Sequence, residues 1–204
     1  MAANKVKFGL KNVYYAVATE ATSSGVTTTT YGTPVAFPGA VSLEVNASNS
    51  DPTIFRADDS DYFIVSGSTQ GFDGTFESAY IPEAFEKNVL GMVADDDGVI
   101  VEADSQTVKA VALLFEINGD DHARRYLLPK VVFTKPGISA ETTGTDGNNP
   151  KTASLSFKAS PRPDDGFARI HTGDTTSTAT YNAWFSAVYS PTFTQNAQTP
   201  GEED

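Results

Sequence analysis

Apolar and polar side chains alternate along several stretches of this 204-residue chain. A period of two is typical of strands with one buried face, and a run that is apolar on both faces indicates a strand buried on both sides. The stretches are residues 5–18, 40–46, 69–81, 108–117, 124–133 and 152–160. In 69–81, for example, we expect Phe72, Phe76 and Tyr80 to face the core, and Asp73 and Glu77 to face away. The pattern predicts a mainly β protein.

Two stretches carry helical signals instead. In IPEAFEKNVLG, Pro82 suits the first position of a helix and Gly91 the position just after its end, so we expect a short helix near 82–90. Near the C-terminus, a spacing of i, i+3, i+4 and i+7 predicts an amphipathic helix near 178–188. The residues with this spacing are Tyr181, Trp184, Phe185 and Val188.

Turn signals connect the predicted strands. Residues 118–123 (NGDDHA) separate two apolar runs and predict a hairpin, and Pro129 in its second strand requires a bulge or an edge position. Three polar stretches, 19–34, 47–63 and 135–150, are expected to be long loops, the first of them a loop or a mobile hairpin, and residues 192–204 an acidic tail. We therefore expect one domain over 1–204, an antiparallel β-sandwich or barrel with flanking helices.

Charge and composition narrow the functional classes. The formal net charge of −12 disfavours tight binding to nucleic-acid backbones or to anionic membranes, because each phosphate contact needs a cation. The absence of cysteine excludes disulfides, thiolate zinc sites and cysteine nucleophiles. The sequence shows no apolar run of about 18 residues and no apolar signal segment, so we expect synthesis in the cytoplasm.

No catalytic or metal-binding pattern stands out. An EF-hand loop starting at Asp95 would need a carboxylate at its twelfth position, where Gln106 stands. Asp73 and Glu77 lie four apart on one strand, about 13 Å by strand rise, which exceeds the separations used in glycoside hydrolysis. With only His122 and His171, and with no phosphate-binding loop or nucleophile elbow, we expect no enzyme activity, cofactor or metal.

Several segments, in this order, resemble the major tail protein of long-tailed, non-contractile bacteriophages. They are FGLKNVYYAV (8–17), YGTPVAFPGAVSLEV (31–45), IPEAFEKNVLG (81–91), ALLFEINGDDHARRYLL (112–128) and YNAWFSAVY (181–189). The resemblance implies a tail-tube β-sandwich fold and a structural virion protein whose rings, hexameric in related tubes, stack into the conduit for DNA ejection. It also implies tape-measure, tail-tip and tail-terminator proteins as partners, DNA that passes without specific binding, and no membrane.

Two groups of residues become candidates under this resemblance. The loop 47–63 has apolar and basic residues at the centre of an acidic stretch, which suggests contact between subunits or rings. Its candidates are Ile54, Phe55, Arg56, Asp58, Asp59 and Asp61. Carboxylates on polar strand faces would line the lumen and repel DNA, with Lys158 on such a face diluting the effect. These candidates are Glu44, Asp73, Glu77 and Glu116.

The stretch 31–45 raises its own question, because two prolines and two glycines precede the strand with Val41, Leu43 and Val45 on one side. A stiff entry would help each copy in a ring adopt one geometry, and an ordinary Pro-Gly turn explains it equally well. Two other functions also stay open. One is a monomeric β-sandwich binding module for carbohydrates or surfaces; the other is the tube subunit of a contractile secretion machine.

Overall fold

The computed structural model of the chain describes residues 9–49, 53–57, 59–65, 69–118, 123–140 and 151–193. It is mainly β, with antiparallel strand pairs and two short helices, as the alternation predicts. The elements are β1 (Leu10–Ser23), β2 (Val26–Tyr31), β3 (Val35–Ala36), β4 (Ala40–Asn49), β5 (Thr53–Ala57), β6 (Ser60–Val65), β7 (Thr69–Ser78), α1 (Glu83–Asn88), β8 (Val93–Ala94), β9 (Ile100–Val101), β10 (Val111–Ile117), β11 (Arg124–Phe133), β12 (Ala153–Ala159), β13 (Ile170–His171) and α2 (Thr178–Ala183). None of the helices in these ranges is long and apolar enough to cross a membrane.

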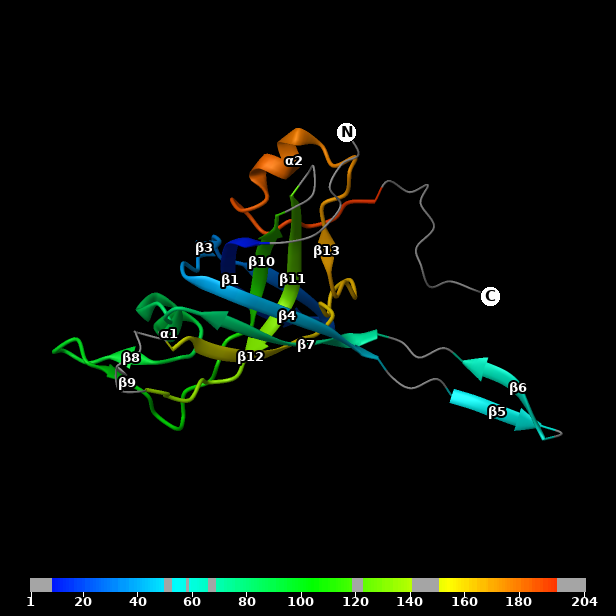
Figure 1. Ribbon diagram of the computed structural model, residues 1–204, viewed down its shortest axis with the longest axis horizontal. Coiled ribbons are helices and arrows are strands. Elements are labelled where there is room, and N and C mark those ends of the chain that lie inside the picture. The colour runs from blue at the N-terminus through cyan, green and yellow to red at the C-terminus, as the bar shows by residue number, and fades with distance from the viewer. Residues whose placement is uncertain are drawn as a thin grey trace, which may run out of the picture.

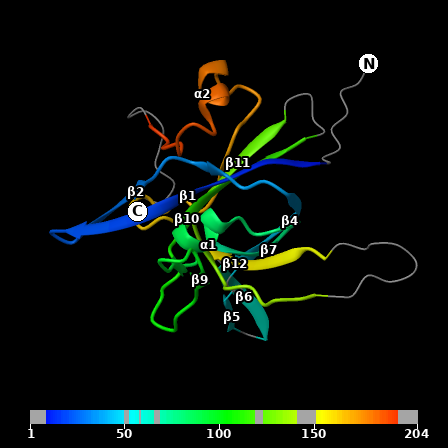
Figure 2. The ribbon, with the colours of Figure 1, turned by 90° about the vertical axis from the view of Figure 1, so that its left-hand side faces the viewer.

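One large antiparallel sheet organises the molecule. Its strand order is β2-β1-β10-β11-β12-β7-β4, with β3 paired to β1 and β13 paired to β11. Two small hairpins, β5–β6 and β8–β9, lie outside this sheet. Figure 1 shows β5–β6 projecting from one end of the molecule, β8–β9 and α1 at the other end, and α2 above the sheet. The turned view in Figure 2 shows the β1–β2 end as a further projection.

The main core lies on one side of this sheet, where aromatic rings pack around α1. Phe85 of α1 is fully buried, and its ring makes edge contacts with Tyr15, Phe37 and Phe133 at centroid distances of 5.0, 4.9 and 5.2 Å. Such edge-to-face pairs add stability beyond the area that they bury. Val89, the residue directly after the end of α1, is also fully buried.

A second cluster lies on the other side of the sheet, under the segment that begins with α2. It contains Ala16, Ala112, Leu114, Leu127 and Trp184. The helix is shorter than predicted, because α2 ends at Ala183 and not near residue 188. Its apolar positions still reach the sheet, since Trp184 is 3% exposed and its ring stacks on Tyr189 at 5.5 Å.

The hairpin over 108–133 is confirmed as β10 and β11, and β10 is buried along almost its whole length. Val111 pairs with Val131 and Leu113 pairs with Leu128, so β11 carries one more residue than β10 between these pairs. The extra residue is a β-bulge beside Pro129, which satisfies the expectation that the proline sits at a bulge or an edge.

The stiff stretch before β4 crosses from the β2 end of the sheet to its opposite edge. Its residues 35–36 pair with β1, and Phe37 donates its backbone N–H to the Val13 carbonyl at 2.7 Å. Gly39 has a φ of +86°, and its carbonyl accepts a hydrogen bond from the buried Ser78 hydroxyl at 3.0 Å. The prolines and glycines therefore fit a tight crossover that brings β4 toward β1.

Three expectations need correction. The stretch 47–63 is not a loop throughout, because it contains the end of β4 and the strands β5 and β6, whereas 19–34 forms the hairpin that was one of its two predicted alternatives. Tyr80 does not share the buried face of Phe72 and Phe76; β7 ends at Ser78, and Tyr80 is 52% exposed. Val41 is also exposed, because a bulge between Ala40 and Ser42 turns it outward.

Candidate functional site

Three of the four carboxylates proposed to line a lumen lie on one face of neighbouring strands. Glu44 of β4 pairs with Thr75 of β7, while Asp73 and Glu77 of β7 pair with residues on both β4 and β12. We call this the polar sheet face. Its members are Ser42, Glu44 and Asn46 of β4, Asp73, Thr75 and Glu77 of β7, and Ser154, Ser156 and Lys158 of β12. The alternation of the three strands places these side chains opposite the buried ones.

Neighbouring polar groups hold each carboxylate on this face. The Ser42 hydroxyl donates to Glu77 Oε2 at 3.0 Å, and the Asn46 amide donates to Glu44 Oε1 at 2.9 Å. Lys158 Nζ lies 3.8 Å from Asp73 Oδ1, and 87% of the lysine side chain is exposed. Such exposed pairs contribute little stability. The face therefore carries an acidic excess in contact with solvent.

A shallow hollow of about 320 Å³ opens on the polar sheet face. Asp73 and Lys158 stand at its rim with Asn46, and small side chains such as Thr75, Thr134 and Ser156 also line it. Gly74 lies in this wall with its missing side chain directed inward, where a Cβ would stand 2.3 Å from the ring of Phe157. The hollow has hydrogen-bonding groups but little apolar surface, so it suits water or a polar partner better than an apolar ligand.

The fourth carboxylate does not belong to this face. Glu116 is 7% exposed and lies on the side of the sheet that α2 covers, where Arg125 Nε donates to its Oε2 at 2.9 Å. The Arg125 guanidinium also sits 3.7 Å from the centroid of the Tyr181 ring. The expectation that Glu116 presents an exposed charge is therefore wrong. The alternation of residues within β10 gives no information about α2, which covers this side of the sheet.

The residues proposed for contact between subunits lie on the β5–β6 hairpin and its turn. Ile54, Phe55 and Arg56 belong to β5, and Asp61 belongs to β6, where it pairs with Arg56 in the strand register. Arg56 and Asp59 are exposed, and Asp59 has a φ of +55°, as a tight turn allows for aspartate. Asp58 lies outside the described residues. Arg56 and Asp59 therefore stand on a hairpin that projects from the body (Figure 1).

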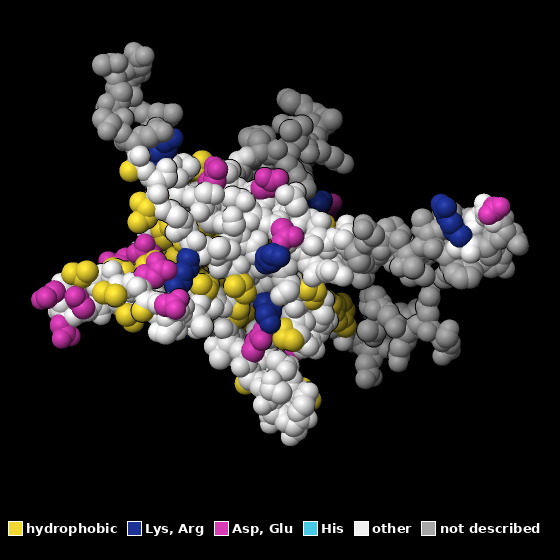
Figure 3. All heavy atoms as spheres, turned by 90° about the horizontal axis from the view of Figure 1, so that it is seen from below, with side chains coloured by type: hydrophobic (Ala, Val, Ile, Leu, Met, Phe, Trp, Pro, Cys, Tyr) yellow, Lys and Arg dark blue, Asp and Glu magenta, His cyan; other side chains and the backbone are white. Residues whose placement is uncertain are grey.

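The β8–β9 hairpin forms another projection, with acidic and apolar side chains side by side (left in Figure 3). Asp95 Oδ1 accepts the N–H groups of Asp97 and Val99, which fixes the turn at Asp97-Gly98. Val93, Val99 and Val101 are all exposed. Within the described ranges, no group of three or more acidic or histidine side chains is placed to hold a metal ion.

An ion cluster at the edge of the sheet was not predicted. Arg162 is 5% exposed and contacts both Asp164 and Asp165, while Asp164 Oδ2 accepts the backbone N–H of Thr29 on β2 at 3.4 Å. Burial acts to raise the pKa of Asp165, but hydrogen bonds from Arg162 and from the Phe167 N–H outweigh it and hold the pKa below its ordinary value of 3.8. The ion pairs join residues two and three positions apart within 161–167 (PRPDDGF), and only the contact of Asp164 with Thr29 depends on β2 lying beside this segment.

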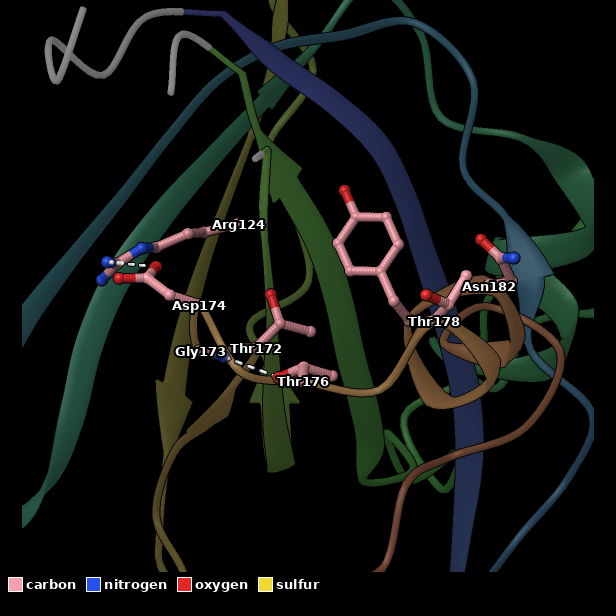
Figure 4. A pocket seen from close by; sticks show the side chains of 8 residues that line it. Arg124, Thr172, Gly173, Asp174, Thr176, Thr178 and Asn182 are labelled. Atoms are coloured by element: carbon pink, nitrogen blue, oxygen red, sulfur yellow. Dashed lines mark hydrogen bonds and ion pairs between the residues drawn. The ribbon is translucent and has the colours of Figure 1, made fainter. Parts of the chain in front are cut away.

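Figure 4 shows a second polar hollow, of about 270 Å³, beside α2. Arg124 and Asp174 form an ion pair at 3.3 Å on one side of it, and Asn182 and Thr178 stand on the other. The remaining lining residues are Thr172, Gly173, Thr176 and Tyr181. Hydroxyl, amide and charged groups thus converge here. Of the lining residues, only Thr178, Tyr181 and Asn182 lie in the stretch predicted as a helix, and the hollow itself was not predicted.

Histidine offers no catalytic arrangement in the part of the chain that the structure describes. His171 Nδ1 lies 3.1 Å from the Thr172 carbonyl oxygen, and the ring is tilted against Tyr126 at 5.5 Å. His122 lies outside the described residues.

Comparison with known proteins does not identify the chain: no protein-family model matches it, and no curated protein sequence matches it.

Proposed function

We propose that this chain is a structural virion protein that self-assembles into stacked rings, hexameric by resemblance, and so forms a bacteriophage tail tube. The observation that carries the proposal is the grouping of Glu44, Asp73 and Glu77 on one solvent-facing sheet face. The ordered resemblance to siphophage tail proteins in the sequence supports the same function. The residues proposed to line a lumen are these three carboxylates, without Glu116.

An acidic sheet face suits a conduit for DNA. Phosphates near carboxylates are repelled, so DNA would slide past the wall without the cation contacts that hold nucleic acids to proteins. Lys158 partly offsets this charge, but its pairing with Asp73 leaves the face acidic. The projecting β5–β6 and β8–β9 hairpins supply surfaces for neighbouring subunits, and in this proposal Arg56 and Asp59 take part in contacts between rings.

Negative-stain electron microscopy of the purified protein at rising concentration, alongside light scattering, tests this function. We expect hollow tubes or rings with a regular axial repeat and a scattering mass that grows with concentration. A particle that stays monomeric at every concentration, with and without a co-expressed tail-tip complex, would contradict the proposal. The matched control is a variant in which Glu44, Asp73 and Glu77 are all changed to Gln. Tubes formed by this variant would show that assembly does not depend on the charge of the proposed lumen.

The hollow of Figure 4 favours one alternative, a monomeric module that binds carbohydrate. Sugar hydroxyls pair well with planar charged and amide groups, and Arg124, Asp174 and Asn182 supply such groups around one cavity. A glycan-array screen of the monomer tests this alternative. Binding that disappears in an Asp174→Ala variant, together with no assembly, would replace the tube proposal.

A further inference from the structure

A third hollow, of about 360 Å³, lies beside β2 on the side of the sheet that carries α2. Two segments far apart in the sequence form most of its wall: residues 29–34, at and after the end of β2, and residues of the stretch 186–190, after α2. It shares no lining residue with the hollow of Figure 4. Ligand sites usually measure about 300–1,000 Å³, so this hollow suits a small ligand.

A buried arginine belongs to this hollow, and its charge is already matched. Arg162 is 5% exposed and forms ion pairs with Asp164 and Asp165. One cation between two carboxylates leaves an excess of negative charge, so a phosphate or carboxylate ligand would be repelled. A cationic ligand would have to compete with Arg162 for the same two carboxylates. The charges at this hollow therefore favour a neutral ligand.

Hydroxyl groups dominate the exposed part of the wall, and the exposed residues that carry them are Thr30, Thr33, Ser186 and Ser190. Each hydroxyl both donates and accepts hydrogen bonds. Thr29, also in the wall, is only 8% exposed, and its hydroxyl has no hydrogen-bond partner in the described part of the chain. Buried polar groups without partners are uncommon in folded proteins. A ligand that carries hydroxyls of its own would supply the missing bond.

Three partly buried side chains add apolar surface to the same wall: Tyr31, Pro34 and Val188. The Tyr31 hydroxyl donates to the Pro129 carbonyl oxygen at 3.0 Å, which holds the aromatic ring in place. Sugar rings combine hydroxyl edges with faces of C–H groups, so they pair with a wall that is both hydroxylated and apolar. An open-chain polyol has the hydroxyls but no rigid face.

We infer that this hollow binds a neutral saccharide. Ligand hydroxyls pair with the wall hydroxyls, including that of Thr29, and a ring face packs against Tyr31 and Pro34. The inference goes beyond the proposed function and does not depend on it, because a single chain supplies every residue of the hollow.

The single tryptophan reports on this hollow. Trp184 stacks on Tyr189 at 5.5 Å, and the two neighbours of Tyr189 in the sequence, Val188 and Ser190, line the hollow. We would titrate the natural chain with glucose, galactose, N-acetylglucosamine and maltose, and follow tryptophan fluorescence and Tm. We expect saturable binding of at least one sugar with a Kd of about 1 mM or lower, and no response to sorbitol or inorganic phosphate. No saturable change in fluorescence and no rise in Tm with any of the sugars would overturn the inference.

A filling variant places the binding in this hollow. Ala187 is exposed and lines the hollow, so Ala187→Phe is expected to weaken binding at least about tenfold by occupying the space. Ala183→Phe is the matched control, because Ala183 is also exposed on this part of the chain but does not line the hollow. Equal binding by the two variants would overturn the inference.

Two smaller changes test the contacts. Thr29→Val removes the buried hydroxyl and keeps the backbone N–H that Asp164 accepts, so we expect binding at least about threefold weaker with no loss of Tm in the free protein. Asp174→Ala, in the hollow of Figure 4, is expected to leave binding unchanged. Binding that Thr29→Val leaves intact, or that Asp174→Ala abolishes, would contradict the assignment to this hollow.

Discussion

Removal of the Glu116 carboxylate is the most direct test of the packing under α2. Arg125 Nε lies 2.9 Å from Glu116 Oε2, and the two side chains are only 15% and 9% exposed. Removing one partner of a buried pair leaves the other charge without its partner in a poorly hydrated site, at a cost of about 3–5 kcal/mol. Arg125 keeps its contacts with the Tyr181 ring at 3.7 Å, with the Phe185 ring at 4.9 Å and with the Tyr181 carbonyl oxygen. We therefore expect the lower end, about 3 kcal/mol, for Glu116→Ala.

Urea unfolding followed by tryptophan fluorescence measures this loss, because the single Trp184 lies in the same cluster. For a chain of this size, a loss of about 3 kcal/mol lowers Tm by about 6–12 °C. Glu44→Ala on the polar sheet face is the matched control, and we expect it to stay within about 0.5 kcal/mol of the natural chain.

The double variant Glu116→Leu/Arg125→Met separates the charge from the packing. Apolar residues of similar volume often replace a buried pair at little cost, so we expect the double variant to recover most of the lost stability. The reasoning is refuted if Glu116→Ala costs less than about 1 kcal/mol, or if the double variant is as unstable as the sum of the two single changes.

Three further changes test other parts of the fold. Phe85→Ala removes a fully buried ring that touches three others, and we expect a loss of about 3–5 kcal/mol in urea unfolding; a loss below 2 kcal/mol would contradict its central place in the core. Gly74→Ala places a Cβ 2.3 Å from an aromatic ring and from a backbone oxygen, so we expect a loss of at least about 2 kcal/mol, whereas Gly137→Ala, with no atom within 4 Å, is expected to be nearly neutral. Asp165→Asn tests the ion cluster by pH: because the folded pKa of Asp165 lies below 3.8, its contribution is complete above the unfolded pKa and is lost as pH falls through the folded value, so the natural chain's advantage over the variant is expected to be constant from pH 5 to 7 and to shrink toward pH 3. An advantage that grows toward acid pH would reverse the assignment.

The strands were predictable because alternation reports directly which face is buried. In β12, Leu155 and Phe157 are buried and Ser154 and Ser156 are exposed, as the period of two requires. The same logic brought Glu44, Asp73 and Glu77 onto polar positions, though the sequence could not say that β4, β7 and β12 are neighbours. That adjacency depends on long-range pairing, which no local pattern contains.

The incorrect predictions lie where a distant segment or a local irregularity overrides the pattern of apolar and polar residues. Glu116 was assigned to an exposed face by its place in a strand, but α2, more than 60 residues later in the chain, covers that side of the sheet. Val41 sits at a bulge, where one extra residue changes the alternation locally. We expected the stretch 47–63 to be a loop because most of its residues are polar. It contains two short strands that pair with each other.

Ion pairs between basic side chains and carboxylates of the same chain explain why the remaining surface is acidic. Seven described lysines and arginines form ion pairs with carboxylates of the same chain: Lys87, Arg124, Arg125, Lys130, Lys135, Lys158 and Arg162. Each ion pair is neutral, so the formal net charge of −12 is carried by the remaining charged residues. In the proposed tube, neighbouring copies with such surfaces would repel one another unless the contact between them brings opposite charges together.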